Sequence, residues 1–274
     1  MTVPGSPGRP GADRPAPHLH YPLRLPNPWI QWIRRAEEAA DQGVETATHG
    51  VESAHLPAWL RRTHGEPRWP VTLAIMVAIA LQVLLPDRET LPLHWLLPSL
   101  EGALLVGLII ANPVRIGARS RLVQPASLLL VLLITVANAA SAVLLVRVIL
   151  ESRGGSNNPQ GLLATGAAIW LTNIIAFALW YWEFDRGGPV ERARATSPYP
   201  DLGFPQMVSP QLAAPDWEPR FPDYLYLAFT NATAFSPTDV MPLARWAKLT
   251  MMLQSVVSLV LAALVIARAV NILK

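Results

Sequence analysis

Five long apolar blocks constrain this chain more than any other feature of its sequence. They cover residues 71–85, 91–111, 127–150, 162–182 and 249–273, and few charged residues interrupt them. Roughly 20 apolar residues cross the ~30 Å hydrocarbon core of a bilayer, and a charge placed in that core costs several kcal/mol. We therefore expect an all-α integral membrane protein with five transmembrane helices and one further short helix.

The remaining segments define the expected domain organisation. Residues 1–28 are rich in proline and glycine and are expected to form a disordered arm. Residues 29–62 carry small apolar residues at three- and four-residue steps and predict an amphipathic helix. Residues 69–155 then form a three-helix membrane bundle. Residues 160–274 form a second unit with a helix, a polar loop (183–222), a short helix (223–235) and a final helix.

Arginine and lysine near the ends of the blocks predict the orientation of the chain. Most of them fall on the side that holds the start of the first block, the loop 183–222 and the start of the last block. Basic residues favour the cytoplasmic side, so the N-terminus is expected there. The arginine, alanine and proline bias suggests a bacterium, and hence a multi-pass protein of its inner (plasma) membrane.

The run YLYLAFTNATAFSPTDVMP precedes the last block. A short apolar helix, a turn containing threonine and aspartate, and a long apolar helix follow one another in this region. This order resembles the pore domain of tetrameric potassium channels, where it would be a re-entrant pore helix, a filter and an inner helix. The resemblance implies a homotetramer that passes small monovalent cations. It places the filter at Thr233, Ala234, Phe235, Ser236, Pro237, Thr238 and Asp239.

The same run also resembles a group of uncharacterised bacterial membrane proteins, the DUF1345-like proteins, which bring no settled activity. Ser236 and Thr238 replace the two filter glycines of potassium channels, so a potassium-type ladder of carbonyls is not expected here. The basic residues place this turn on the cytoplasmic side, as in an inverted pore. Alternatively, the short helix lies at the membrane surface and residues 236–239 only cap the final helix.

Polar residues recur at mid-bilayer depth in three of the blocks. Glu101 lies in the second block, Asn138 in the third and Asn173 in the fourth. A carboxylate inside a membrane predicts a functional site, so Glu101 is a candidate cation or proton site with the two asparagines as ligands. Alternatively, the amides bond helix to helix, and Glu101 is protonated or pairs with Arg147. Glu183 and Asp185 form a weaker candidate cation site at the end of the fourth block.

Several classes of function lack support in the sequence. The chain has no cysteine and none of the common motifs of hydrolases, metalloproteases or nucleotide-binding enzymes. We expect neither an enzyme, a resident metal or cofactor, nor a nucleic-acid partner. The leading hypothesis is a homo-oligomeric, channel-like protein for small monovalent cations. The alternatives are a non-conducting scaffold or partner-binding protein, and a small-solute transporter that uses Glu101.

Overall fold

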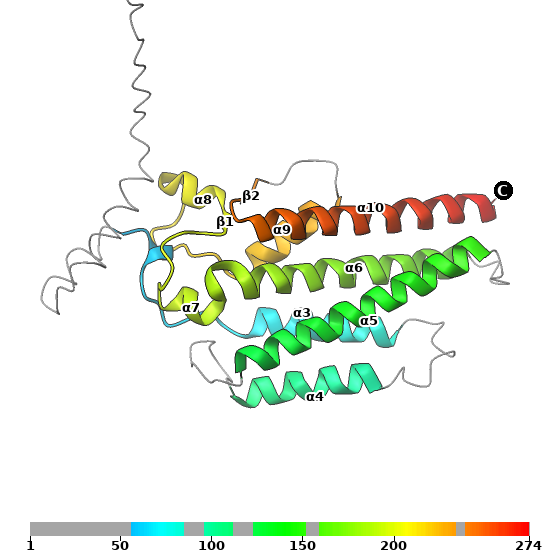
Figure 1. Ribbon diagram of the computed structural model, residues 1–274, viewed down its shortest axis with the longest axis horizontal. Helices are drawn as coiled ribbons and strands as arrows, with labels where there is room; N and C mark the ends of the chain where they lie inside the picture. The colour runs from blue at the N-terminus through cyan, green and yellow to red at the C-terminus, as the bar shows by residue number, and fades with distance from the viewer. Residues whose placement is uncertain (1–55, 85–95, 112–122, 152–158, 234–238, 274) are drawn as a thin grey trace, which may run out of the picture. The chain divides into compact units, whose positions relative to one another are not determined.

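The computed structural model describes residues 56–84, 96–111, 123–151, 159–233 and 239–273, all within the compact unit Gly43–Lys274. These residues are mostly helical (Figure 1). The apolar helices are α3 (Trp69–Val83), α4 (Leu96–Ala111), α5 (Val123–Glu151), α6 (Pro159–Phe184) and α10 (Arg245–Leu273).

Three of these helices, α5, α6 and α10, are long and apolar enough to cross a membrane. Helices α3 and α4 are apolar but shorter within the described residues. The all-α class and several apolar helices fit the expected integral membrane protein, whereas the count of five spans stays a prediction.

Helix α6 lies at the centre of the packing and contacts α3, α5, α9 (Phe221–Thr233) and α10. At one end of the bundle, Leu145, Ile169, Leu261 and Val265 from α5, α6 and α10 form a buried apolar cluster. Helices α6 and α10 approach closely here, because a Cβ on Gly166 would lie 2.7 Å from both γ-carbons of Val265. Glycine at 166 therefore permits this contact.

At the opposite end, the segment after α6 folds into short elements instead of one irregular loop. Helix α6 ends at Phe184, and shortly after it Gly187 and Gly188 adopt positive φ angles of 81° and 97°. The short elements are η3 (Asp185–Gly187), α7 (Pro189–Ala193), β1 (Leu202–Gly203), α8 (Pro205–Val208), η4 (Pro210–Leu212) and β2 (Met241–Pro242). We call this end of the bundle the polar end.

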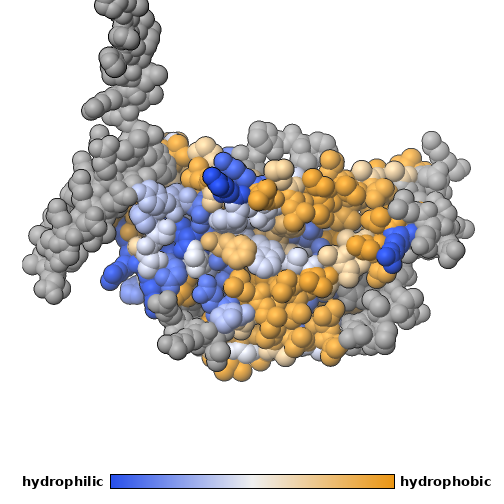
Figure 2. All heavy atoms as spheres, in the orientation of Figure 1, coloured by the Kyte–Doolittle hydropathy of each residue, from blue (hydrophilic) through white to orange (hydrophobic). Residues whose placement is uncertain are grey.

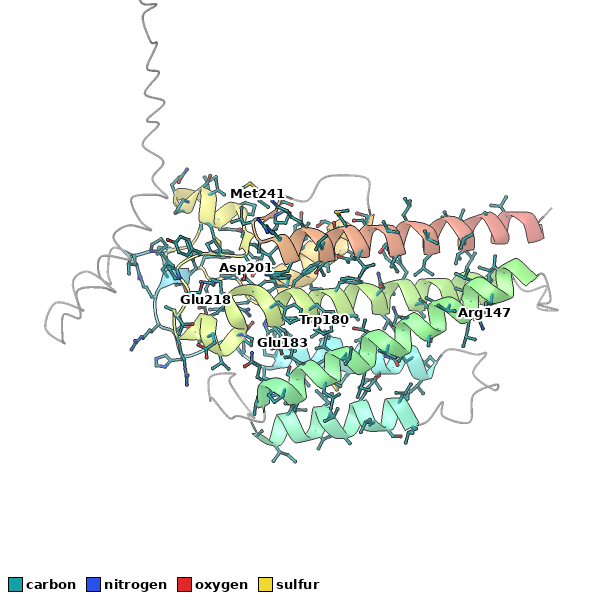
Figure 3. All side chains as sticks on the ribbon, viewed as in Figure 1. Arg147, Trp180, Glu183, Asp201, Glu218 and Met241 are labelled. Atoms are coloured by element: carbon teal, nitrogen blue, oxygen red, sulfur yellow. The ribbon has the colours of Figure 1, made fainter. Side chains whose placement is uncertain are left out.

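Hydropathy separates the two regions of the molecule. Hydrophobic side chains gather over the long helices in Figure 2, whereas hydrophilic side chains gather at the polar end. Glu183, Asp201 and Glu218 lie toward the polar end in Figure 3, and Arg147 lies toward the opposite end of α5. This division is the one that a bilayer around the helices requires.

Two predicted boundaries differ from the structure. Residues 56–62 do not continue an amphipathic helix. They contain the single 3-10 turn η2 (Ala58–Leu60), which follows the extended backbone of Pro57. The final helix begins at Arg245, four residues before the predicted start of the last block. The predicted arm (1–28) and most of the predicted amphipathic helix (29–55) lie outside the described residues.

Candidate functional site

Helix α9 packs between α6 and α10 (Figure 1). It begins at the polar end and runs beside the first third of α10. Asn231, near its last turn, bonds to Met251 and Gln254 of α10. At a rise of about 1.5 Å per residue, Gln254 lies roughly 14 Å beyond the first residue of α10. The deep part of α9 also contacts α6, where the rings of Phe229 and Trp170 lie 6.1 Å apart.

Buried amides fix the depth of α9 in the bundle. The Oε1 atom of Gln254 accepts hydrogen bonds from the Tyr181 hydroxyl (2.7 Å) and from Nδ2 of Asn231 (2.8 Å). Its Nε2 atom donates to the Ala228 carbonyl at 2.7 Å. The Ser255 hydroxyl donates to Oδ1 of Asn231 at 3.1 Å. We call Tyr181, Asn231, Gln254 and Ser255 the amide cluster; it joins α6, α9 and α10.

After α9, the chain returns to the polar end. Strand β2 pairs antiparallel with β1, with Met241 opposite Gly203. The amides of Leu243 and Ala244 then donate to the Asp201 carbonyl just before α10 begins. Since the first turn of α9 also lies at the polar end, the segment 221–242 enters the helix packing and leaves it on the same side. The first turn of α9 and strand β2 are therefore at the same end of the bundle, whereas residues 234–238 between them lie outside the described residues.

Glu66 holds the first residue of α9. Its Oε2 atom accepts a 2.9 Å hydrogen bond from the backbone amide of Phe221. Its Oε1 atom accepts from Nε1 of Trp182 (2.5 Å) and forms an ion pair with Arg192 (3.2 Å). A carboxylate that accepts an amide at a helix start offsets the unpaired donors of that turn. The Glu66 side chain therefore joins the ends of α6 and α7 to the start of α9.

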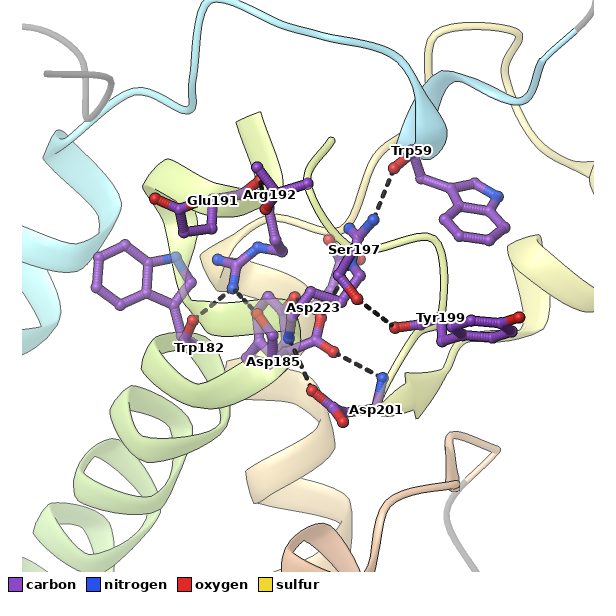
Figure 4. A network of polar contacts seen from close by, with 12 residues as sticks. Trp59, Trp182, Asp185, Glu191, Arg192, Ser197, Tyr199, Asp201 and Asp223 are labelled. Carbon is purple, nitrogen blue, oxygen red and sulfur yellow. Dashed lines mark hydrogen bonds and ion pairs between the residues drawn. The ribbon is translucent and has the colours of Figure 1, made fainter. Parts of the chain in front are cut away.

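A second carboxylate, Asp185, lies near Arg192 and Asp201 (Figure 4). Asp185 is fully buried, and its Oδ2 atom accepts the Tyr224 hydroxyl at 2.6 Å. Its Oδ1 atom accepts the backbone amide of Asp201 at 3.2 Å. The Arg186 guanidinium lies 3.9 Å from Asp185 and donates to the Trp59 carbonyl. Glu66, Asp185, Arg186, Arg192 and Tyr224 form what we call the charge cluster.

Burial controls the protonation behaviour of the ion pair between Glu66 and Arg192. Burial raises the pKa of Glu66 above its ordinary value of 4.5, although Arg192, Phe221 and Trp182 act in the opposite direction. Burial lowers the pKa of Arg192, but Tyr224, Glu66 and Asp185 outweigh that effect and raise it overall. Arg192 therefore stays charged, and Glu66 is the member of the pair that titrates.

The predicted filter lies partly outside the described residues. Thr233 is the last residue of α9, and its hydroxyl donates to the Thr230 carbonyl. Asp239 is exposed where the chain returns to the polar end. Ala234, Phe235, Ser236, Pro237 and Thr238 lie outside the described residues. The alternative that residues 236–239 cap the final helix is wrong, because β2 separates them from its first residue, Arg245.

The predicted polar layer is divided between different contacts. Nδ2 of Asn173 donates to the Ser258 hydroxyl at 3.2 Å, so this amide bonds helix to helix, as the alternative hypothesis held. Glu101 is completely buried in α4 and Asn138 nearly so in α5. Among the described residues, no ion pair joins Glu101 to Arg147, and Arg147 is exposed.

The two carboxylates of the weaker predicted cation site, Glu183 and Asp185, bond to different protein groups. The Ser127 hydroxyl donates to Glu183, whereas Asp185 bonds to Tyr224 and Asp201. Within the described ranges, no group of three histidine, aspartate or glutamate side chains is placed to hold a metal ion.

Sequence reasoning missed the residues that hold α9. Glu66 precedes the first apolar block in a short stretch of mixed polarity, and its partners lie more than 100 residues away. Gln254 is a detectable signal, because an amide inside an apolar block predicts a hydrogen bond between helices. Comparison with known proteins adds nothing to these assignments: no family model, curated protein or solved structure matches the chain.

Proposed function

We propose that this protein is a homo-oligomeric, channel-like membrane protein for small monovalent cations, in which α6, α9 and α10 form the repeating pore unit. The path of residues 221–242 carries the proposal, because it enters and leaves the helix packing on one side. Such a path delivers a short turn to the interior of a bundle. Copies arranged about one axis would bring their turns 233–239 together.

Electrostatics favours a cation over an anion at this turn. The C-terminal end of a helix carries about half a negative charge, and the last turn of α9 packs against α10, where Asn231 and Ala232 are buried. Asp239 adds a carboxylate on the returning chain. The hydroxyls of Thr230 and Thr233 donate their hydrogens to carbonyls of α9 itself. Neither hydrogen is therefore directed at a cation near the end of this helix.

Flux through purified protein tests the proposal. The full chain in liposomes is expected to pass rubidium or potassium, and Asp239→Ala and Phe235→Ala are expected to reduce that flux severalfold. Asp216→Ala is the matched control, because it removes an exposed carboxylate at the polar end that lies outside segment 221–242. Unchanged flux in both test variants would remove the pore assignment, and absence of flux would favour the non-conducting scaffold.

A small-solute transporter is the second candidate, because polar groups are enclosed in the neighbouring helices α3 and α4. Gln82 is 1% exposed and Glu101 is 0% exposed. A buried carboxylate in a membrane helix is a common proton or cation site. In this case Glu101→Gln, but not Asp239→Ala, would abolish uptake.

A further inference from the structure

An exposed stripe runs down the first three turns of α10. Its members are Arg245, Lys248, Leu249, Met252 and Val256, which recur at three- and four-residue steps and so share one helix face. Leu249, Met252 and Val256 are each at least 60% exposed. We call these five residues the α10 stripe; it begins with two cations and continues with apolar side chains only.

The two cations of the stripe have no acidic partner within the described part of the chain. Four other basic side chains at the polar end do have one. Arg186 lies near Asp185, Arg192 pairs with Glu66, Arg194 with Glu191, and Arg220 with Glu218. Among the residues described, no ion pair involves Arg245 or Lys248, so their positive charges remain available to an external anion.

Aromatic rings mark the depth at which these cations lie. Trp180 and Phe184 of α6 have ring centroids 4.9 Å apart, and Phe184 and Trp246 of α10 have centroids 5.6 Å apart. Tryptophan is enriched at the headgroup level of membranes. Arg245 and Lys248 lie on either side of Trp246 in the sequence, so a bilayer that places Trp246 at headgroup level would place both cations near headgroup phosphates.

The apolar part of the stripe is long enough to lie along much of one acyl chain, which occupies half of the ~30 Å hydrocarbon core. Leu249 and Val256 are seven residues apart, which is roughly 10 Å along a helix. Exposed apolar residues continue on α10 through Leu259, Ile266 and Val270, so the face from Leu249 spans about 30 Å, the thickness of the hydrocarbon core. Hydrophobic side chains gather along α10 in Figure 2.

We propose that the α10 stripe binds an anionic phospholipid. Arg245 and Lys248 hold the headgroup phosphate, and Leu249, Met252 and Val256 contact one acyl chain. Charge complementarity selects this occupant, because a zwitterionic lipid offers the same chains without net negative charge. The proposal does not depend on conduction, since it concerns binding to the purified protein.

Binding of defined lipids to the full chain in detergent tests the proposal, with native mass spectrometry as the readout. The probes are dioleoylphosphatidylglycerol and dioleoylphosphatidylcholine, which share acyl chains, and inorganic phosphate. The test variant is R245Q/K248Q. The matched control is R62Q/R220Q, which removes two exposed positive charges from the polar end outside the stripe. The test side chains are exposed, so the variants are expected to fold, and thermal unfolding checks this.

The expected result is tighter binding of phosphatidylglycerol than of phosphatidylcholine. The R245Q/K248Q variant is expected to weaken phosphatidylglycerol binding roughly thirtyfold, at about one kcal/mol per basic residue. The R62Q/R220Q control is expected to bind as the unchanged chain does. Equal weakening in both double variants, equal binding of the two lipids, or competition by inorganic phosphate at millimolar concentration would overturn the proposal. A change of subunit number in R245Q/K248Q would also overturn it and would assign the stripe to a second copy of the chain.

Discussion

The Tyr224 hydroxyl donates a 2.6 Å hydrogen bond to Oδ2 of Asp185, and both side chains are completely buried. This bond joins the first turn of α9 to the residue that follows α6. It lies beside the bond from the Phe221 amide to Glu66, so two carboxylates hold the same helix start. These bonds fix the start of α9, and the amide cluster fixes the part near its other end.

Removing the Tyr224 hydroxyl is expected to destabilise the protein. A buried hydrogen bond to a charged group contributes about 1.5–3 kcal/mol, so Tyr224→Phe should lower the unfolding temperature by several degrees. Tyr226→Phe is the control, because Tyr226 is 52% exposed on the same helix. Thermal unfolding in detergent provides the measurement. Equal unfolding temperatures for the two variants would contradict the role given to the bond with Asp185.

The amide cluster is expected to show energetic coupling between α9 and α10. In a double-mutant cycle with Asn231→Ala and Gln254→Ala, the coupling free energy should be about 0.5–2 kcal/mol, because the two amides bond at 2.8 Å. A cycle with Thr230→Ala and Gln254→Ala should be additive to within about 0.5 kcal/mol, since Thr230 bonds only within α9. Additive Asn231 and Gln254 substitutions would show that α9 is not held at this depth.

Close packing of α6 on α10 is expected to make Gly166 sensitive to substitution. Gly166→Ala places a methyl group 2.7 Å from Val265, and overpacking of this kind costs about 1–3 kcal/mol. Gly107→Ala in α4 is the control, because its Cβ would meet no atom within 4 Å. Val265→Ala should restore part of the stability of Gly166→Ala when the two are combined. Unfolding free energies in a mild detergent give the comparison.

Glu66 is expected to make stability depend on pH. Its pKa is raised by burial, so the folded protein binds a proton more tightly than the unfolded chain does. The stability that protonation of Glu66 contributes is complete below about pH 4.5, the ordinary pKa of a glutamate. It is lost as the pH rises through the raised pKa of the folded state. Glu66→Gln cannot titrate and should show a flatter dependence of unfolding temperature on pH. Identical profiles for the two proteins would show that Glu66 does not titrate in this range.

The apolar helices and α9 could be predicted from the sequence because they depend on local composition. Helix α9 has 13 residues, Phe221–Thr233. Each of its ends lies within two residues of the end predicted for the short helix, 223–235. The fourth block, 162–182, likewise ends within two residues of the end of α6 at Phe184. These features need no knowledge of distant residues.

The attachment of α9 could not be predicted, because it joins residues far apart in the chain. Glu66 bonds to Phe221 across 155 positions, and no local pattern distinguishes it from other acidic residues near a membrane helix. The burial of two arginines in the charge cluster could not be predicted from the sequence either. The orientation prediction counts Arg186 and Arg192 with the other basic residues near the ends of the blocks, and nothing in that count indicates that both are buried among carboxylates and backbone carbonyls.

The same-side path of residues 221–242 is the central claim, and single-cysteine labelling tests it most directly, because the chain has no cysteine of its own. Asp239→Cys, Ser197→Cys and Asn157→Cys would be treated with a membrane-impermeant thiol reagent in sealed vesicles of known orientation. In the sequence, residue 157 lies between α5 (Val123–Glu151) and α6 (Pro159–Phe184), so the account expects it at the end of the bundle opposite the polar end. The account predicts that positions 239 and 197 react from one side and position 157 from the other. Reaction of positions 239 and 157 from the same side would show that α9 crosses the membrane, and would contradict the re-entrant path.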